Sequence, residues 1–120
     1  MAEKVKPTAQ VEPFHDVLGE DGTIDLLLEF SGTVLYLPKS PRNSTLARRF
    51  GVERVAALAE RLGEMYVRVP SQNRWLAAIL FQRGLSKADI ARKLRISDVT
   101  VRKYLREAGL DRDKRQGELF

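Results

Sequence analysis

The stretch from Leu85 to Arg106 (LSKADIARKLRISDVTVRKYLR) constrains the fold more than any other part of the chain. Ser86 and Ser97 each precede a run whose apolar residues recur at helical spacing, and each hydroxyl is placed to cap the helix that follows. Asp89 lies three residues after Ser86, which approximates a capping box. Two helices of this length bury too little surface to be stable alone. We therefore predict two short helices, joined by a tight turn and packed on a third.

The third helix precedes them in the sequence. Residues 75–83 are strongly apolar and end at Gly84, a residue suited to the position just after a helix. Arg95 occupies the turn position that often holds Gly, and a left-handed conformation there costs Arg about 1 kcal/mol relative to Gly. The pattern predicts a three-helix helix-turn-helix domain over residues 71–110. The alternative is an ordinary helical hairpin with solvated basic faces.

The distribution of charge favours the first interpretation. Residues 1–70 hold nine Lys and Arg against ten Asp and Glu, whereas residues 71–120 hold twelve against six. The excess positive charge therefore lies on the predicted helix-turn-helix, as expected for a domain that binds the phosphates of double-stranded DNA. The function that we expect is a sequence-specific DNA-binding regulator.

Candidate DNA contacts lie on the outward face of the last helix, over residues 97–106, and at helix starts, where backbone N–H groups can hold phosphate. The residues expected to contact bases are Asp98, Val99, Arg102 and Lys103. Those expected to contact phosphates or to lie at helix starts are Thr100, Arg106, Asn73, Arg74, Ser86 and Ser97.

Other functional classes find little support in the sequence. The chain has no cysteine, and His15 is its only histidine, so we expect no disulfide and no metal site. It has no Gly-rich phosphate loop, HExxH or GxSxG motif, so we expect no enzymatic activity and no cofactor. It lacks a membrane-length apolar run and a signal-like amino terminus, which favours a cytoplasmic protein.

The first half of the chain is expected to mix short helices with two strands. Thr33–Leu37 and Met65–Val69 are β-branched or aromatic runs that each end at a proline, which indicates short strands. The fold class is therefore mainly α. The predicted regions are a flexible arm at 1–13, a dimerisation region at 14–70, the helix-turn-helix at 71–110 and a charged tail at 111–120. Within the dimerisation region we expect helix at 14–18, helix or strand at 23–30, and helices at 45–50 and 52–62.

Two short strands in a small protein leave sheet edges that need partners. Pairing across a two-fold axis would cover these edges and would present two DNA-binding helices at once, so we expect a homodimer with intersubunit strand pairing. The residues predicted at this dimer contact are Val34, Tyr36, Leu37, Tyr66 and Val67.

Four features follow one another along the chain. They are the run Gly32-Thr-Val-Leu-Tyr-Leu-Pro-Lys39, the second strand ending at Pro70, the helix start at Asn73-Arg74 and the helix-turn-helix. Together they resemble the Mor/C family of middle-operon transcription activators from Mu-like phages, over roughly residues 24–108. The resemblance implies a homodimer with an amino-terminal dimer contact and a carboxy-terminal DNA-binding domain. It also implies activation of a phage promoter through contact with the host RNA polymerase.

The tail ends in Gln116-Gly-Glu-Leu-Phe120, which resembles the short peptide that docks bacterial replication and repair proteins on the sliding clamp. In that interpretation Leu119 and Phe120 fill an apolar pocket and Gln116 orients the peptide. Alternatively, Leu119 and Phe120 pack on the protein itself or on a dimer partner. A clamp-binding tail would support a second function, that of a small adaptor that binds DNA without sequence preference and recruits a replication or transcription component through residues 116–120.

Overall fold

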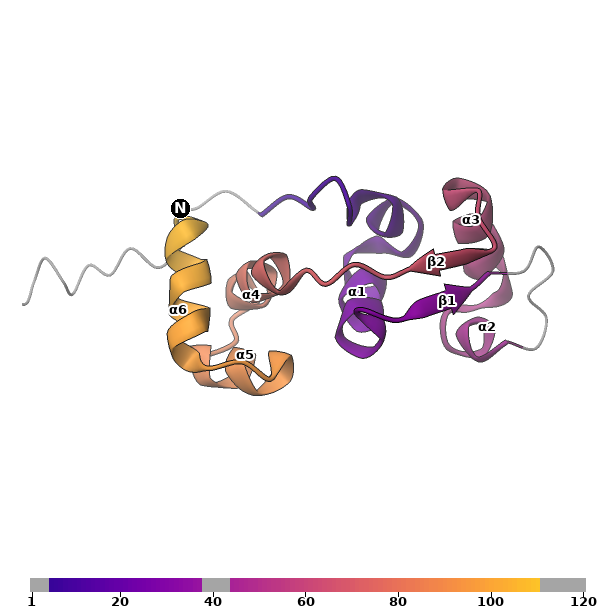
Figure 1. Ribbon diagram of the computed structural model, residues 1–120. Helices are drawn as coiled ribbons and strands as arrows, with labels where there is room; N and C mark the ends of the chain where they lie inside the picture. Colours follow the sequence, from indigo (N-terminus) through magenta and orange to yellow (C-terminus); the bar gives the residue numbers. More distant parts are fainter. Residues whose placement is uncertain (1–4, 38–43, 111–120) are drawn as a thin grey trace, which may run out of the picture. The chain divides into compact units, whose positions relative to one another are not determined.

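The computed structural model describes residues 5–37 and 44–110, and in these residues the chain is mainly helical, as predicted (Figure 1). The chain divides into two compact units, which are described separately below: an amino-terminal unit, Pro7–Gln72, and a carboxy-terminal unit, Asn73–Phe120 with Met1–Lys6. The elements are α1 (Glu12–Phe30), β1 (Val34–Tyr36), α2 (Thr45–Phe50), α3 (Val52–Leu62), β2 (Tyr66–Arg68), α4 (Asn73–Gln82), α5 (Lys87–Leu94) and α6 (Asp98–Glu107).

Helix α1 includes both segments expected at 14–18 and 23–30. Its helical conformation is interrupted at Gly19, where φ is 74°, and the Thr23 hydroxyl donates to the Gly19 carbonyl at 2.7 Å. This bond gives the Gly19 carbonyl a side-chain partner at the break. The open choice between helix and strand at 23–30 is therefore settled as helix, because its apolar residues pack along one helical face.

The second half of the arm expected over residues 1–13 contains a turn and the first residues of α1. The Thr8 carbonyl accepts hydrogen bonds from the Val11 and Glu12 amides at 3.0 and 2.9 Å, and Val11 is fully buried. A buried valine stabilises the turn that leads into α1, although the polar and proline-rich composition around it gave no such signal.

Both predicted strands are present, in shorter form, and they pair with each other. β1 and β2 are antiparallel, with Tyr36 opposite Tyr66 and Leu35 opposite Val67. The expectation of intersubunit strand pairing is corrected to this extent: the helices between the strands return the chain beside β1, so the first partner of each strand lies in the same chain. In the described part of the chain the sheet has two strands, so each strand retains an outer edge.

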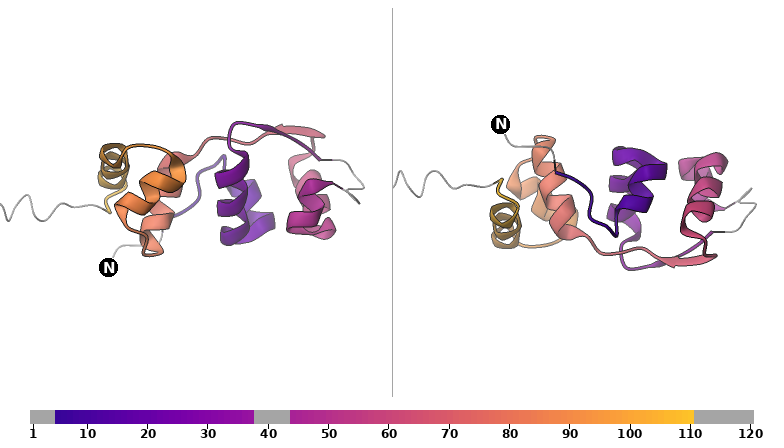
Figure 2. Two further views of the ribbon diagram at one scale, coloured as in Figure 1. Left: turned by 90° about the horizontal axis from the view of Figure 1, so that it is seen from below. Right: turned by 90° about the horizontal axis from the view of Figure 1, so that it is seen from above.

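The core of the amino-terminal unit lies between its helices and one face of this ribbon. Figures 1 and 2 show α1, α2 and α3 on the same side of the two strands. Leu35 and Val69 are buried on that face, and Val55 and Leu58 of α3 are buried where it packs against α1 and α2. The opposite face of the ribbon is not covered by these helices, and it carries exposed apolar side chains.

The carboxy-terminal unit is built around α4, in which every residue from Trp75 to Leu80 is buried. Helices α5 and α6 pack on α4 and on each other through Ile90, Val101 and Leu105, which are fully buried. A helix that is apolar on all sides belongs at the centre of a domain, whereas α5 and α6 are apolar on one side only. This arrangement confirms the three-helix packing expected from the sequence.

The helix boundaries in this unit follow the predicted caps. Ser86 accepts from the Asp89 amide and Ser97 from the Thr100 amide, each at 3.1 Å. All three helices end in paired backbone bonds of the Schellman type, around Gly84, Arg95 and Gly109. Arg95 adopts the left-handed conformation with φ 58°, as its turn position predicted.

Candidate nucleic-acid interface

The exposed face of α6 carries the strongest candidate interface. Val101 and Leu105 anchor the helix in the core, so the residues on the opposite side of the helix point outward. Val99 is 61% exposed, which is high for a large apolar side chain. Lys103 and Arg106 are exposed as well, and Arg102 is half-buried. Spacings of three and four residues place these four side chains along one stripe of the helix.

Two side chains in the first turns of α6 interact with each other. Arg102 donates from Nη1 to the Asp98 carboxylate at 3.4 Å, one helical turn apart. Both side chains are about half exposed, so the ion pair contributes little to stability. Its physical effect is on geometry, because the carboxylate restricts the rotamers from which the guanidinium can approach a ligand.

The serine and threonine candidates at helix starts are engaged within the protein. The Ser97 hydroxyl caps α6 and lies 2.9 Å from the Thr100 hydroxyl, and Thr100 is half-buried. The Ser86 hydroxyl caps α5 in the same way. These side chains fix where the helices begin, because each serine hydroxyl satisfies an amide of the first turn that has no partner within the helix.

The two candidates at the start of α4 differ in their surroundings. Asn73 is the first residue of the helix and is half-buried. Arg74 is exposed, but its guanidinium forms an ion pair with Glu107 and lies over the ring of Tyr104, 4.8 Å from the ring centroid. Tyr104 and Glu107 belong to the last turns of α6. Sequence reasoning missed this cluster, because the residues are far apart in the chain and no spacing connects them.

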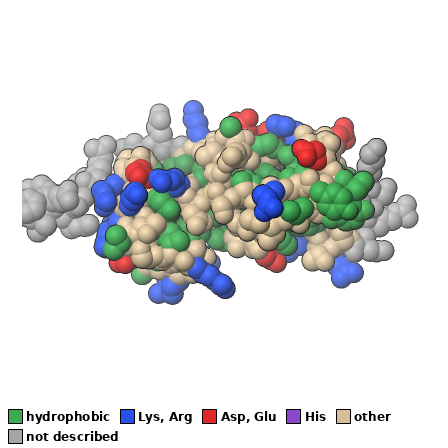
Figure 3. Space-filling view, in the orientation of Figure 1, with side chains coloured by type: hydrophobic (Ala, Val, Ile, Leu, Met, Phe, Trp, Pro, Cys, Tyr) green, Lys and Arg blue, Asp and Glu red, His purple; other side chains and the backbone are tan. Residues whose placement is uncertain are grey.

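Positive charge dominates the surface of the helix-turn-helix. Residues 73–110 hold nine Lys and Arg against three Asp and Glu, and two of those three carboxylates pair with Arg92 and Arg102. Figure 3 shows Lys and Arg side chains gathered over this unit. A surface of this charge attracts the phosphates of nucleic acid at long range.

A second exposed surface lies on the amino-terminal unit. We call Val34, Tyr36, Tyr66 and Arg68 the ribbon outer face, because they alternate outward from β1 and β2. Tyr36 and Tyr66 are 50% and 63% exposed, and their ring centroids are 5.3 Å apart. This apolar surface is visible as green side chains over the ribbon in Figure 3.

The structure divides the predicted dimer residues between the two faces of the ribbon. Val34, Tyr36 and Tyr66 lie on the outer face, where a partner can reach them. Leu37 is only 2% exposed and Val67 is half-buried, because alternation along a strand turns them toward the helices. Leu37 therefore belongs to the core of its own chain, and Val67 is less accessible than the residues of the outer face.

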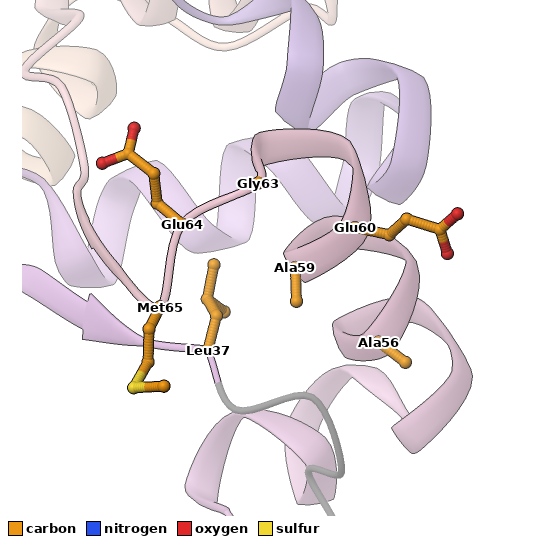
Figure 4. A pocket seen from close by; sticks show the side chains of 7 residues that line it. All are labelled: Leu37, Ala56, Ala59, Glu60, Gly63, Glu64 and Met65. Carbon is orange, nitrogen blue, oxygen red and sulfur yellow. The ribbon is translucent and has the colours of Figure 1, made fainter.

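A small apolar pocket opens beside the end of the ribbon (Figure 4). It has a volume of about 420 Å³ and lies between α3 and the start of β2. Figure 4 shows that the carboxylates of Glu60 and Glu64 point away from the apolar side chains. The residues that line it are Leu37, Ala56, Ala59, Glu60, Gly63, Glu64 and Met65. The lining offers apolar contact and no constellation of polar groups suited to catalysis.

The structure describes residues 5–37 and 44–110, and two statements about absent features apply to these residues. This part of the chain contains no group of three His, Cys, Asp or Glu residues that could hold a metal ion. None of its helices combines the length and the apolar character that crossing a membrane requires. The predicted partner motif, Gln116, Leu119 and Phe120, lies outside the described residues.

Comparison with known proteins agrees with the geometry of the carboxy-terminal unit. The model of the homeodomain-like domain family matches residues 69–112, which include α4, α5 and α6. The match supports a helix-turn-helix domain of the DNA-binding class, and it does not extend to the narrower resemblance to Mor/C activators. No curated protein and no solved structure matches the chain.

Proposed function

We propose that the protein is a sequence-specific regulator of transcription that inserts α6 into the major groove of double-stranded DNA. The observation that carries this proposal is the exposed stripe of α6. One apolar and three cationic side chains project from a helix whose opposite face is fixed in a three-helix core. An α-helix fits the major groove, and a helix-turn-helix places its second helix there.

The residues of the stripe are suited to different parts of the DNA. Arg102 can donate two parallel hydrogen bonds to guanine. Asp98 pairs with the Arg102 guanidinium, and its carboxylate can either accept a hydrogen bond from cytosine or restrict Arg102 to one base. Val99 offers apolar contact to a thymine methyl group. Lys103 lies beside them on the same face and can reach bases or phosphates, whereas Arg106, near the end of the helix, is better placed for phosphate.

A selection from random-sequence duplexes at near-physiological salt tests this proposal. The purified chain is expected to enrich one motif, and Arg102→Ala is expected to relax the preference at one position of it. The same protein should bind unrelated DNA more weakly, with strong dependence on salt. Retention of DNA without any enriched motif would contradict sequence-specific recognition.

We also propose that the regulator is a homodimer joined through the ribbon outer face. Residues 7–72 hold seven Lys and Arg against nine Asp and Glu, so this unit lacks the excess of positive charge that the helix-turn-helix carries. Its exposed tyrosines and Val34 are instead the kind of surface that protein contacts cover. Two copies would present two α6 helices to two half-sites about one helical turn apart.

A role as an activator that contacts RNA polymerase rests on the Mor/C resemblance alone. A promoter carrying the selected motif, fused to a reporter, would give increased transcription when the protein is supplied. Reduced transcription from the same promoter would instead make the protein a repressor.

A further inference from the structure

Arg74 makes two contacts that both lead to the carboxy-terminal end of α6. Its guanidinium pairs with the Glu107 carboxylate and stacks over Tyr104, one turn earlier on the same helix. An arginine held by a carboxylate and an aromatic ring is restricted in two directions, because the planar guanidinium must satisfy both. The contacts join the first turn of α4 to the last turn of α6.

The charges of this pair are also placed favourably across the two helices. Arg74 lies in the first turn of α4 and Glu107 in the last turn of α6, where each charge is unfavourable to the dipole of its own helix. The pair places the positive charge of Arg74 at the partly negative end of α6 and the negative charge of Glu107 at the partly positive end of α4, and both placements are favourable. This exchange gives the two helix ends a preference for lying together.

The two ends of α6 are otherwise held differently. Its amino-terminal end is fixed by the turn at Arg95 and by the Ser97 cap. Its carboxy-terminal half is held by buried Leu105, and Tyr104 is only half-buried. Val101 and Leu105 already anchor α6 in the core, so the surface contact of Arg74 can restrain only small changes in the angle of the helix. Even a small change of this angle moves the exposed side chains of its first turns.

We propose that Arg74 is a positioning residue that sets the angle of α6 for base recognition, and that it does not serve mainly as a phosphate contact. We call Arg74, Tyr104 and Glu107 the α4–α6 clamp. The proposed consequence for recognition rests on the proposed DNA-binding function. The clamp itself can be tested without DNA.

The first experiment measures coupling within the clamp in the full chain. Hydrogen exchange is followed at the Ala108, Gly109 and Leu110 amides, which bond to carbonyls in the last turns of α6. Arg74→Ala and Glu107→Ala should each speed exchange there about two-fold to five-fold, and the double variant should add little to either. Independent effects of the two substitutions would overturn the clamp.

The second experiment measures DNA binding as a function of salt. Arg74→Ala should weaken binding to the selected motif about three-fold to ten-fold and leave the salt slope unchanged, because no phosphate contact is lost. Arg106→Ala is the matched control, since it removes the same charge from the exposed stripe and should flatten the slope by about one unit. A flattened slope for Arg74→Ala would make Arg74 a phosphate contact.

A charge exchange completes the design. Arg74→Glu combined with Glu107→Arg should restore part of the preference for the selected motif, because the exchange remakes the ion pair but not the stacking on Tyr104. Arg74→Glu alone should lose the preference. If the exchange rate at the Ala108 amide is restored but the preference for the motif is not, the clamp forms without contributing to base recognition, and the proposed positioning role is wrong. If the unaltered chain selects no motif while the amide coupling persists, the proposed function fails and the clamp stands.

Discussion

Arg95 shows how one backbone angle shapes the helix-turn-helix. Gly84 and Gly109 end α4 and α6 in the left-handed conformation, which glycine adopts without steric cost. Arg95 ends α5 in the same conformation with a Cβ present. The turn therefore forms in spite of its residue, because Ile90 and Val101 are buried on either side of it.

Replacing this residue should raise stability. Arg95→Gly is expected to increase the free energy of unfolding by up to about 1 kcal/mol, because relief of left-handed strain outweighs the added freedom of the unfolded chain. Arg92→Gly, the same substitution inside α5, should lower it by about 1 kcal/mol. Urea denaturation measures the free energy of unfolding of both variants. A decrease for Arg95→Gly as well as for Arg92→Gly would show that Arg95 is not strained.

Arg102 carries the most specific prediction for recognition. Arg102→Ala should cost about 1–3 kcal/mol of discrimination at one base position and little affinity for unrelated DNA. Lys93→Ala removes an exposed cation from α5 and serves as the control that should not alter the preferred base. Competition binding with single-position variants of the selected motif measures the effect. Equal losses on specific and unrelated DNA would remove Arg102 from base recognition.

At the scale of elements, the break in α1 depends on a close approach of two residues. Gly22 is buried, and a Cβ added to it would lie 2.9 Å from the Leu18 Cβ. Leu18 is itself buried one turn earlier, on the other side of Gly19. The two helical segments can meet at this angle only because position 22 has no side chain.

This contact reverses the usual effect of replacing a helical glycine. Gly22→Ala should lower the free energy of unfolding by about 1–3 kcal/mol, because a Cβ carbon cannot rotate away as a flexible side chain can. Asp25→Ala, at an exposed position of the same helix, should change it by less than about 0.5 kcal/mol. Thermal unfolding followed by circular dichroism compares the two. A stabilised Gly22→Ala variant would show that the segments readjust.

At the scale of the whole molecule, the proposal assigns dimer assembly to the amino-terminal unit and DNA contact to the carboxy-terminal unit. Tyr36→Lys combined with Tyr66→Lys should yield a monomer, because two cations on the ribbon outer face would oppose two more across a symmetric contact. Val52→Lys is the control, as Val52 is also exposed but lies at the start of α3. Sedimentation measures the mass of each. A dimeric Tyr36 and Tyr66 double variant would place the contact elsewhere.

Much of the fold could be predicted because its signals are local. Serine caps, a glycine after an apolar run and helical spacing are decided by neighbouring residues, and they located α4, α5 and α6 within a few positions. The strands were located in the same way, by short apolar runs ending at proline. The predicted roles of the DNA-binding residues stay predictions until binding is measured.

The sequence by itself determined the helical class, the helix-turn-helix and the uneven charge, because residue type, caps and periodicity act over a few positions. Only the tertiary structure decided that β1 pairs with β2 and that Leu37 and Val67 face the core. It alone also brought Arg74 to Tyr104 and Glu107. These outcomes depend on packing between distant segments, and no pattern in the order of residues specifies which distant side chains meet.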